Sequence, residues 1–169
     1  MKYETHFQDP EDNYPHMDRF EESYGKYLKD PFTMGYYIHL YTDYFWFKYF
    51  IKEAKKDWIK DKNNINRKFT NEEIGNLIYS DFTNLNVQVI ENYNLDLKIF
   101  YEEKNIYIPE YIKEYPYDKT NVIIEKAGLM IINSTWDKEY LFNIKDIEKF
   151  IETSSDLIYN EITKRLHKI

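Results

Sequence analysis

The chain contains no cysteine among its 169 residues. Disulfide bonds and thiolate metal sites are therefore excluded, although this absence does not identify the compartment. The chain also lacks a cluster of basic residues, since Asp and Glu outnumber Lys and Arg by 30 to 23 and the formal charge is -7. Because capture of nucleic acid or of an anionic membrane surface relies on clustered Lys and Arg, we expect neither as a partner. A metal cation is a more natural partner.

Long uninterrupted apolar segments are missing as well. The first residues, MKYETHFQDPED, are acidic and polar and lack the apolar core of a signal peptide. The chain as given is expected to be cytoplasmic, or secreted if a further N-terminal segment belongs to it. The one long apolar run, residues 31 to 50, contains His39, Asp43 and Lys48, which would be costly in a bilayer. We therefore expect no transmembrane segment.

Apolar residues make up 43% of the chain, which is enough for one domain with a full core over residues 1 to 169. The aromatic share is 19% and includes 18 tyrosines, more than a small core needs. Many rings are therefore expected in half-exposed shells or along a cleft. The chain shows no internal repeat and no low-complexity linker.

The patterning predicts an all-α fold around a buried central helix at about residues 31 to 60. Its first part, PFTMGYYIHLYTDYFWFKYF, is apolar or aromatic nearly all the way round, and such a helix is expected to have neighbours on every side. Asp30 is placed to cap this helix, and Pro31 occupies the first position, where a missing N–H costs nothing.

Further helices are expected on both sides of the central one. Residues 1 to 16 read as an irregular lead-in because Asp9 and Tyr14 each precede a proline. Thr70 and Glu73 form a capping box at the start of another helix. Residues 93 to 117 leave two interpretations open, a short helix with a loop or an irregular arm. The remaining predicted helices cover about 17 to 28, 120 to 133 and 144 to 166.

His39 and Asp43 lie four residues apart and so project from one face of the central helix. A buried pair of this kind must have a partner, because burying a polar group without one costs about 2–7 kcal/mol. Spacing alone favours a structural pair, with His6 a solvated residue near the terminus. The alternative is a metal site, since His6, His39 and Asp43 would supply the three nitrogen and oxygen ligands of an open zinc centre.

Two segments of the sequence favour the metal site over the structural pair. THFQDPEDN, followed by DPFTMGYYIHLYTD, resembles the paired motifs of the bacterial zinc-dependent phospholipase C family, a [ST]-H-F-x-D-P loop and a helix with F-x-x-G-x-x-x-H-x-x-x-D. The family shares its all-helical fold with single-strand-specific nucleases. The match covers roughly residues 5 to 50, and within it the residue types, their order and Gly35 agree together.

The resemblance implies that His6, His39 and Asp43 bind zinc, with the Asp43 carboxylate bridging two ions, and that the site hydrolyses a small phosphoester or a phospholipid. Asp9 and Tyr36 would be outer residues that orient the ligands and line the cleft. An aromatic stripe shares the His39 face. Its members Phe32 and Phe50 are expected in the core, while Tyr36 and Trp46 are either core residues or part of a cleft for an acyl chain.

The chain also departs from the family pattern. It begins after the segment that supplies the family's terminal amine, an early histidine and an aspartate, no histidine closely follows Asp43, and the later His and Glu pair is absent. Asp81, Asn84 and Glu91 could supply oxygen ligands, but they rank no higher than ordinary helix-surface residues. Three interpretations remain: a fragment of a full hydrolase, a divergent member with one metal, and a relic without catalysis. The competing hypothesis is a non-catalytic helical domain that binds a protein partner.

Overall fold

The computed structural model describes residues 2–52, 70–100, 107–113, 119–134 and 141–167. Within these ranges the chain forms six α-helices and no strand, which confirms the predicted all-α class. The chain divides into two compact units. Unit 1 contains the described parts of residues 1–57, 107–115 and 150–169, and unit 2 those of residues 58–106 and 116–149. No helix in the described residues is both long and apolar enough to span a bilayer.

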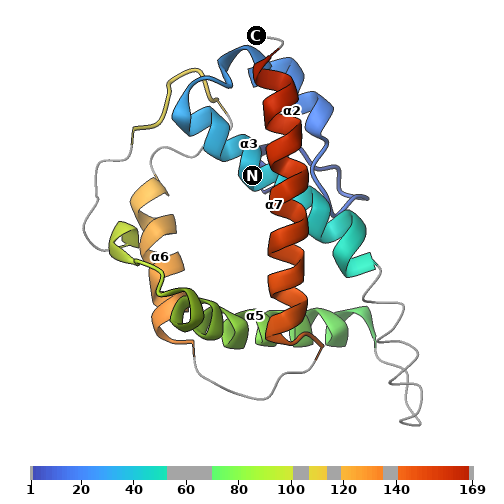
Figure 1. Ribbon diagram of the computed structural model, residues 1–169, viewed down its shortest axis with the longest axis vertical. Helices are drawn as coiled ribbons and strands as arrows, with labels where there is room; N and C mark the ends of the chain where they lie inside the picture. The colour runs from blue at the N-terminus through green and yellow to red at the C-terminus, as the bar shows by residue number, and fades with distance from the viewer. Residues whose placement is uncertain (1, 53–69, 101–106, 114–118, 135–140, 168–169) are drawn as a thin grey trace. The chain divides into compact units, whose positions relative to one another are not determined.

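Unit 1 is built on α2 (Met17–Tyr24) and α3 (Pro31–Phe45), which lie next to each other in Figure 1. The 3-10 turn η1 (Gly25–Tyr27) follows α2, and Asp30 then caps α3 through a 3.0 Å bond from the Thr33 N–H to its Oδ1, as predicted. The core residues come from α2, α3 and the segment 107–113: Met17, Phe20, Tyr24, Leu28, Tyr37, Leu40 and Ile112. Their burial fixes which face of α3 points inward.

The central helix differs from the prediction on one side. Thr33, Tyr37 and Leu40 are buried, but Ile38 and His39 are exposed, so α3 has a solvent-facing side despite its apolar sequence. The expectation of neighbours on every side was wrong because the buried contacts gather on the face that meets α2. The helix continues as the π-helix η2 (Trp46–Phe50) and remains helical to Lys52, and the predicted extension to residue 60 lies outside the described residues.

The lead-in contains a short helix, α1 (Lys2–Thr5), that the sequence did not predict. At its end, the Phe7 N–H donates to the Glu4 carbonyl at 3.2 Å and the Gln8 N–H to the Tyr3 carbonyl at 2.9 Å. These two bonds, with Phe7 in the left-handed region at φ 52°, form a Schellman cap. The helix therefore ends in a fixed turn immediately after Thr5.

Unit 2 contains α5 (Asn71–Tyr93), the 3-10 turn η3 (Lys98–Phe100) and α6 (Thr120–Ile132). The predicted capping box is confirmed, since Thr70 Oγ1 accepts from the Glu73 N–H and the Glu73 carboxylate accepts from the Thr70 N–H. In α6, a Cβ added at Gly128 would lie 3.1 Å from the Cβ of Phe100. The small residue thus allows η3 to approach α6 closely.

The prediction for two residues of α5 was wrong. Asp81 and Asn84 were expected on the helix surface, but both are buried, and the Asp81 side chain is 0% exposed. Asp81 Oδ2 accepts hydrogen bonds from the backbone N–H groups of Leu141, at 2.6 Å, and Phe142, at 2.9 Å. The carboxylate is therefore buried with charge-assisted bonds to a loop sixty residues away.

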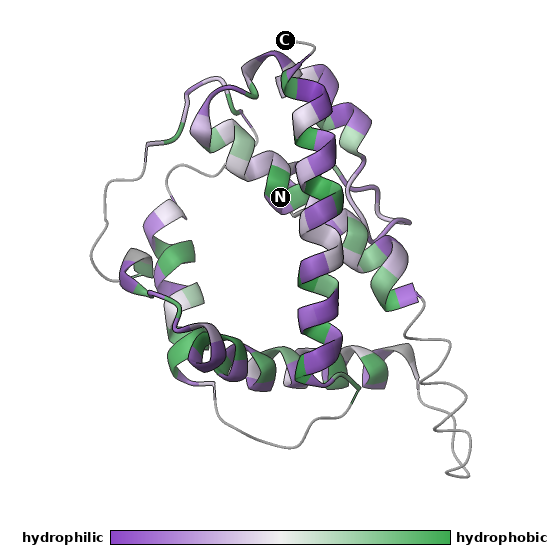
Figure 2. Ribbon diagram, in the orientation of Figure 1, coloured by the Kyte–Doolittle hydropathy of each residue, from purple (hydrophilic) through white to green (hydrophobic). Residues whose placement is uncertain are grey.

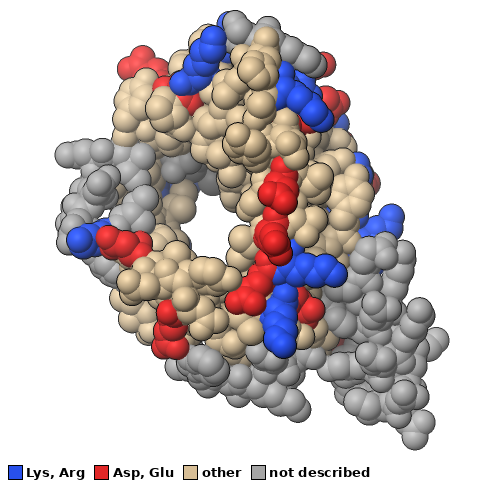
Figure 3. Space-filling view, in the orientation of Figure 1, with Lys and Arg blue, Asp and Glu red and all other residues tan. Residues whose placement is uncertain are grey.

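The last helix, α7 (Ile144–Leu166), has the predicted bounds. Asn143 and Asp146 cap it reciprocally, each side chain accepting from the other's backbone N–H at 3.2 and 3.0 Å. Green and purple bands alternate along α7 in Figure 2, as expected for an amphipathic helix. Acidic side chains form a row in Figure 3. In the sequence of α7, Glu148, Glu152 and Asp156 follow at intervals of four residues.

Candidate metal centre

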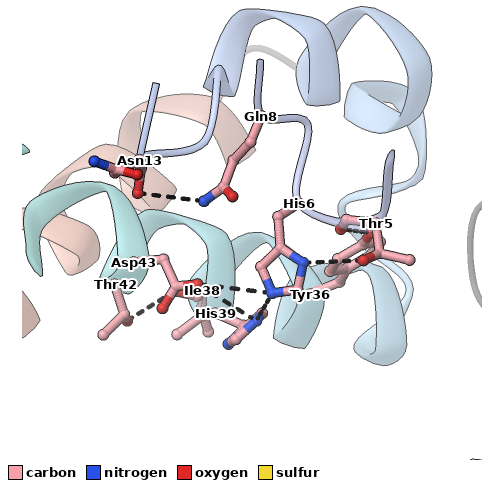
Figure 4. A network of polar contacts seen from close by, with 9 residues as sticks. All are labelled: Thr5, His6, Gln8, Asn13, Tyr36, Ile38, His39, Thr42 and Asp43. Carbon is pink, nitrogen blue, oxygen red and sulfur yellow. Dashed lines mark hydrogen bonds and ion pairs between the residues drawn. The ribbon is translucent and has the colours of Figure 1, made fainter. Parts of the chain in front are cut away.

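His6, His39 and Asp43 come together in unit 1, as the sequence predicted for a metal site. The Nε2 atoms of His6 and His39 lie 3.3 Å apart, and each lies 3.8 Å from Asp43 Oδ2. Figure 4 shows the three side chains pointing toward one another, His6 from the turn after α1 and the other two from adjacent turns of α3. The ligand atoms all lie within 4.8 Å of one another.

The position of His6 follows from the local backbone. The residue is the C-cap of α1, and the Schellman cap fixes the direction in which the chain turns after it. Phe7 adopts a conformation that costs a non-glycine residue about 1–2 kcal/mol. Its ring packs edge-on against Phe20 and Tyr24, at centroid distances of 5.5 and 6.2 Å, which compensates for that cost.

One hydroxyl group contacts the His6 ring, and another holds the His6 turn against α3. Thr5 Oγ1 lies 2.9 Å from His6 Nδ1, and the Tyr36 hydroxyl donates to the Thr5 backbone carbonyl. When His6 Nδ1 carries the proton and donates to Thr5, its Nε2 lone pair is directed at His39 and Asp43. A histidine that ligates a metal usually donates its other ring N–H in this way.

The group is only partly shielded from solvent. The side chains of His6 and Asp43 are 23% and 25% exposed, whereas that of His39 is 54% exposed. The earlier assumption that His39 and Asp43 form a buried pair was therefore wrong for His39, because it lies on the solvent-facing side of α3. This exposure leaves one side of the group open to a ligand.

The donor set fits a zinc-type cation. Ligand bonds of about 2.0–2.2 Å at tetrahedral angles place donor atoms about 3.4 Å apart, close to the 3.3 Å between the two imidazole nitrogens. The two 3.8 Å distances to Asp43 Oδ2 are wider, so the carboxylate would move inward by a few tenths of an ångström on binding. Two imidazoles and one carboxylate are also a ligand set typical of catalytic zinc.

The three outer candidates have different surroundings. Tyr36 lies beside the group, through its bond to Thr5. Asp9 does not join the group: its carboxylate makes two 2.7 Å hydrogen bonds with the Arg19 guanidinium, which lowers the pKa of Asp9.

Trp46 is buried, with ring contacts to Phe50 at 4.7 Å and to Phe150 of α7 at 4.9 Å. Trp46 and Phe50 thus pack against α7.

A second group of ligand-type side chains was not predicted as a site. Asp9, Asp12 and His16 bring their side-chain donors within 4.8 Å of one another in the loop before α2. The available signal was their close spacing around a proline turn. Residues of these types are common in polar loops, so the sequence alone did not distinguish the three.

No family model, no curated protein and no solved structure matches the chain. The resemblance to zinc-dependent phospholipases C therefore depends on the two motifs that carry His6, His39 and Asp43.

Proposed function

We propose that the chain is a metal-dependent phosphoester hydrolase-like protein whose zinc site consists of His6, His39 and Asp43. The observation that carries this proposal is the convergence of the two histidine Nε2 atoms at 3.3 Å beside the Asp43 carboxylate. Bound zinc supplies Lewis-acid chemistry, which polarises a phosphoryl oxygen and favours attack by water. The family resemblance supports a phosphodiester or phospholipid as the substrate.

The chain's own residues have three tasks in this proposal. His6 and His39 bind through Nε2, and Thr5 Oγ1, 2.9 Å from His6 Nδ1, accepts the ring N–H in the tautomer that leaves His6 Nε2 bare. Asp43 provides the anionic ligand and offsets part of the cation's charge. The exposed side of His39 leaves room for a phosphoester to approach. We assign proton transfer to none of the side chains in the described residues.

The test compares two histidine-to-alanine variants of the full chain, purified without chelator. His39→Ala removes one proposed ligand, whereas His167→Ala removes an exposed histidine near the end of α7 as a matched control. We expect His39→Ala to lose the zinc of this site by elemental analysis and to lower hydrolysis of a chromogenic phosphodiester by about 100-fold. Equal zinc content in the two variants would contradict the proposal.

A second candidate function is a non-catalytic helical domain that binds a protein partner. It is favoured by α6, where five apolar side chains are exposed: Val122, Ile123, Leu129, Met130 and Ile132. This function predicts that a chelator leaves the melting temperature of the full chain unchanged, whereas a metal bound only by the folded state must raise it. A fall in melting temperature on chelation that His39→Ala abolishes would therefore favour the hydrolase-like function.

A further inference from the structure

Two backbone hydrogen bonds shape the loop between α1 and α2, one within the loop and one joining its ends. The Asp12 N–H donates to the Asp9 carbonyl at 3.0 Å, forming a turn with Pro10 at its second position, where proline is favoured. The His16 N–H donates to the Phe7 carbonyl, also at 3.0 Å. This closure brings the side chains of Asp9, Asp12 and His16 to one place, next in sequence to the turn that carries His6.

The distances within this group suit a cation. His16 Nε2 lies 2.9 Å from Asp12 Oδ2 and 3.4 Å from Asp9 Oδ2. A metal with ligand bonds of about 2.0–2.2 Å places its donor atoms about 2.9 Å apart at right angles and about 3.4 Å apart at tetrahedral angles. Both distances from the imidazole nitrogen therefore match those of donors that share one ion.

A second, independent observation concerns the imidazole nitrogen itself. The Nε2 atom of His16 is shielded from solvent, although the side chain as a whole is 23% exposed. Within the described residues Nε2 lies at ion-pair distance from both carboxylates but makes no hydrogen bond of acceptable geometry. A shielded polar atom without a well-aligned hydrogen bond costs the folded state free energy. Ligation of a cation by the bare nitrogen would remove that cost.

Arg19 completes the arrangement. Its guanidinium makes two 2.7 Å bonds to Asp9 and thereby holds that carboxylate in place while balancing one negative charge. Carboxylates that ligate metals are commonly held by such outer hydrogen bonds. The two aspartates and Arg19 together leave one net negative charge. A nitrogen donor beside two carboxylates suits zinc or manganese better than calcium or magnesium, which prefer oxygen ligands alone.

We propose that Asp9, Asp12 and His16 form a second divalent-cation site, separate from the His6, His39 and Asp43 group. An ion bound there clamps the loop before α2 and so stabilises the turn from which His6 projects. This site does not depend on the proposed function, because none of its three donors belongs to the first group.

The experiment uses the full chain with His39→Ala and Asp43→Ala together, which removes the first group. Calorimetric titration with zinc is expected to show one remaining equivalent, and adding Asp12→Asn is expected to weaken its binding by about 100-fold. Asp18→Asn, which changes the same charge at an exposed position in the first turn of α2, is the matched control and should leave the affinity unchanged.

Circular dichroism of each metal-free variant checks that the helices remain, and His16→Gln provides a second ligand change if Asp12→Asn does not fold. Absence of zinc binding in the His39→Ala, Asp43→Ala background would overturn the proposal. Equal weakening by Asp12→Asn and Asp18→Asn would overturn it as well, because binding would then reflect overall charge. Neither result bears on the first group, which this background lacks.

Discussion

Two helical aspartates, Asp43 of unit 1 and Asp81 of unit 2, lie in opposite surroundings. Asp81 is fully buried, and its Oδ2 accepts two backbone hydrogen bonds from residues 141 and 142. Asp43 is a quarter exposed and lies 3.8 Å from each of two imidazole nitrogens. Backbone N–H groups can only donate, whereas an unprotonated imidazole nitrogen can also bind a cation.

This contrast separates a structural carboxylate from a candidate ligand. Two backbone N–H groups of the loop before α7 donate to Asp81 Oδ2, so the role of this carboxylate is to hold that loop against α5. The Asp43 carboxylate and its two histidines have an arrangement that a cation would tighten. The predictions below test this difference, from the largest expected effect to the smallest.

Replacing Asp81 with Ala is expected to lower the free energy of unfolding by about 3 kcal/mol, because the backbone N–H groups of Leu141 and Phe142 lose their acceptor. Asp81→Asn should cost less, since its amide oxygen still accepts. Urea unfolding followed by circular dichroism measures both. Glu91→Ala, at an exposed position near the end of the same helix, should stay within about 0.5 kcal/mol of the parent chain. Similar losses for Ala at 81 and 91 would show that Asp81 is not structural.

The second prediction compares Asp43→Asn with Asp81→Asn in chelator and in zinc. In chelator, Asp43→Asn should change the free energy of unfolding by less than about 1 kcal/mol, because Asp43 is partly exposed. With free zinc at about 100 times the dissociation constant, the gap to the parent chain should widen by about 2.7 kcal/mol. The loss of unfolding free energy caused by Asp81→Asn should be the same in chelator and in zinc. If this loss also grew in zinc, the distinction between a structural Asp81 and a metal-binding Asp43 would be wrong.

The sequence was sufficient to predict what depends on short spacings. Asp30 next to Pro31, the capping box at Thr70 and Glu73, and the four-residue interval from His39 to Asp43 all act within one or two helical turns. Local rules therefore located the start of α3, the start of α5 and the face that carries two of the three donors.

What the sequence did not predict depends on distant partners. The burial of Asp81 requires backbone donors sixty residues later in the chain, and no local pattern marks them. The exposed side of α3 was missed because its residues there, Gly35 and Ile38 among them, are no more polar than those on the buried side. The grouping of Asp9, Asp12 and His16 depends on a loop closed through Phe7.

The smallest predicted effect concerns Tyr41, which lies on α3 two residues before Asp43 and so points away from the metal candidate. Burial, with the carboxylates of Glu161 and Glu21, raises the pKa of Tyr41 to about 12 from an ordinary value of 10.0. Between these two values the unfolded chain ionises while the folded chain does not. The contribution of Tyr41 to the free energy of unfolding is therefore fully present below pH 10 and is lost as the pH rises through 12.

Tyr41→Phe should remove part of that alkaline loss. The rise of the Tyr41 pKa from 10.0 to about 12 corresponds to about 2.7 kcal/mol, which we reduce to about 1 kcal/mol because the side chain is only partly buried. Urea unfolding at pH 9 to 12 measures the slope, with Tyr159→Phe on the exposed side of α7 as the control. If the free energy of unfolding of Tyr41→Phe and of Tyr159→Phe falls with pH as steeply as that of the parent chain, the prediction fails. Ionised Tyr41 would then be tolerated on the inward side of α3 as well as an ionised tyrosine on an exposed surface, and the two sides of this helix would not differ in how they accommodate charge.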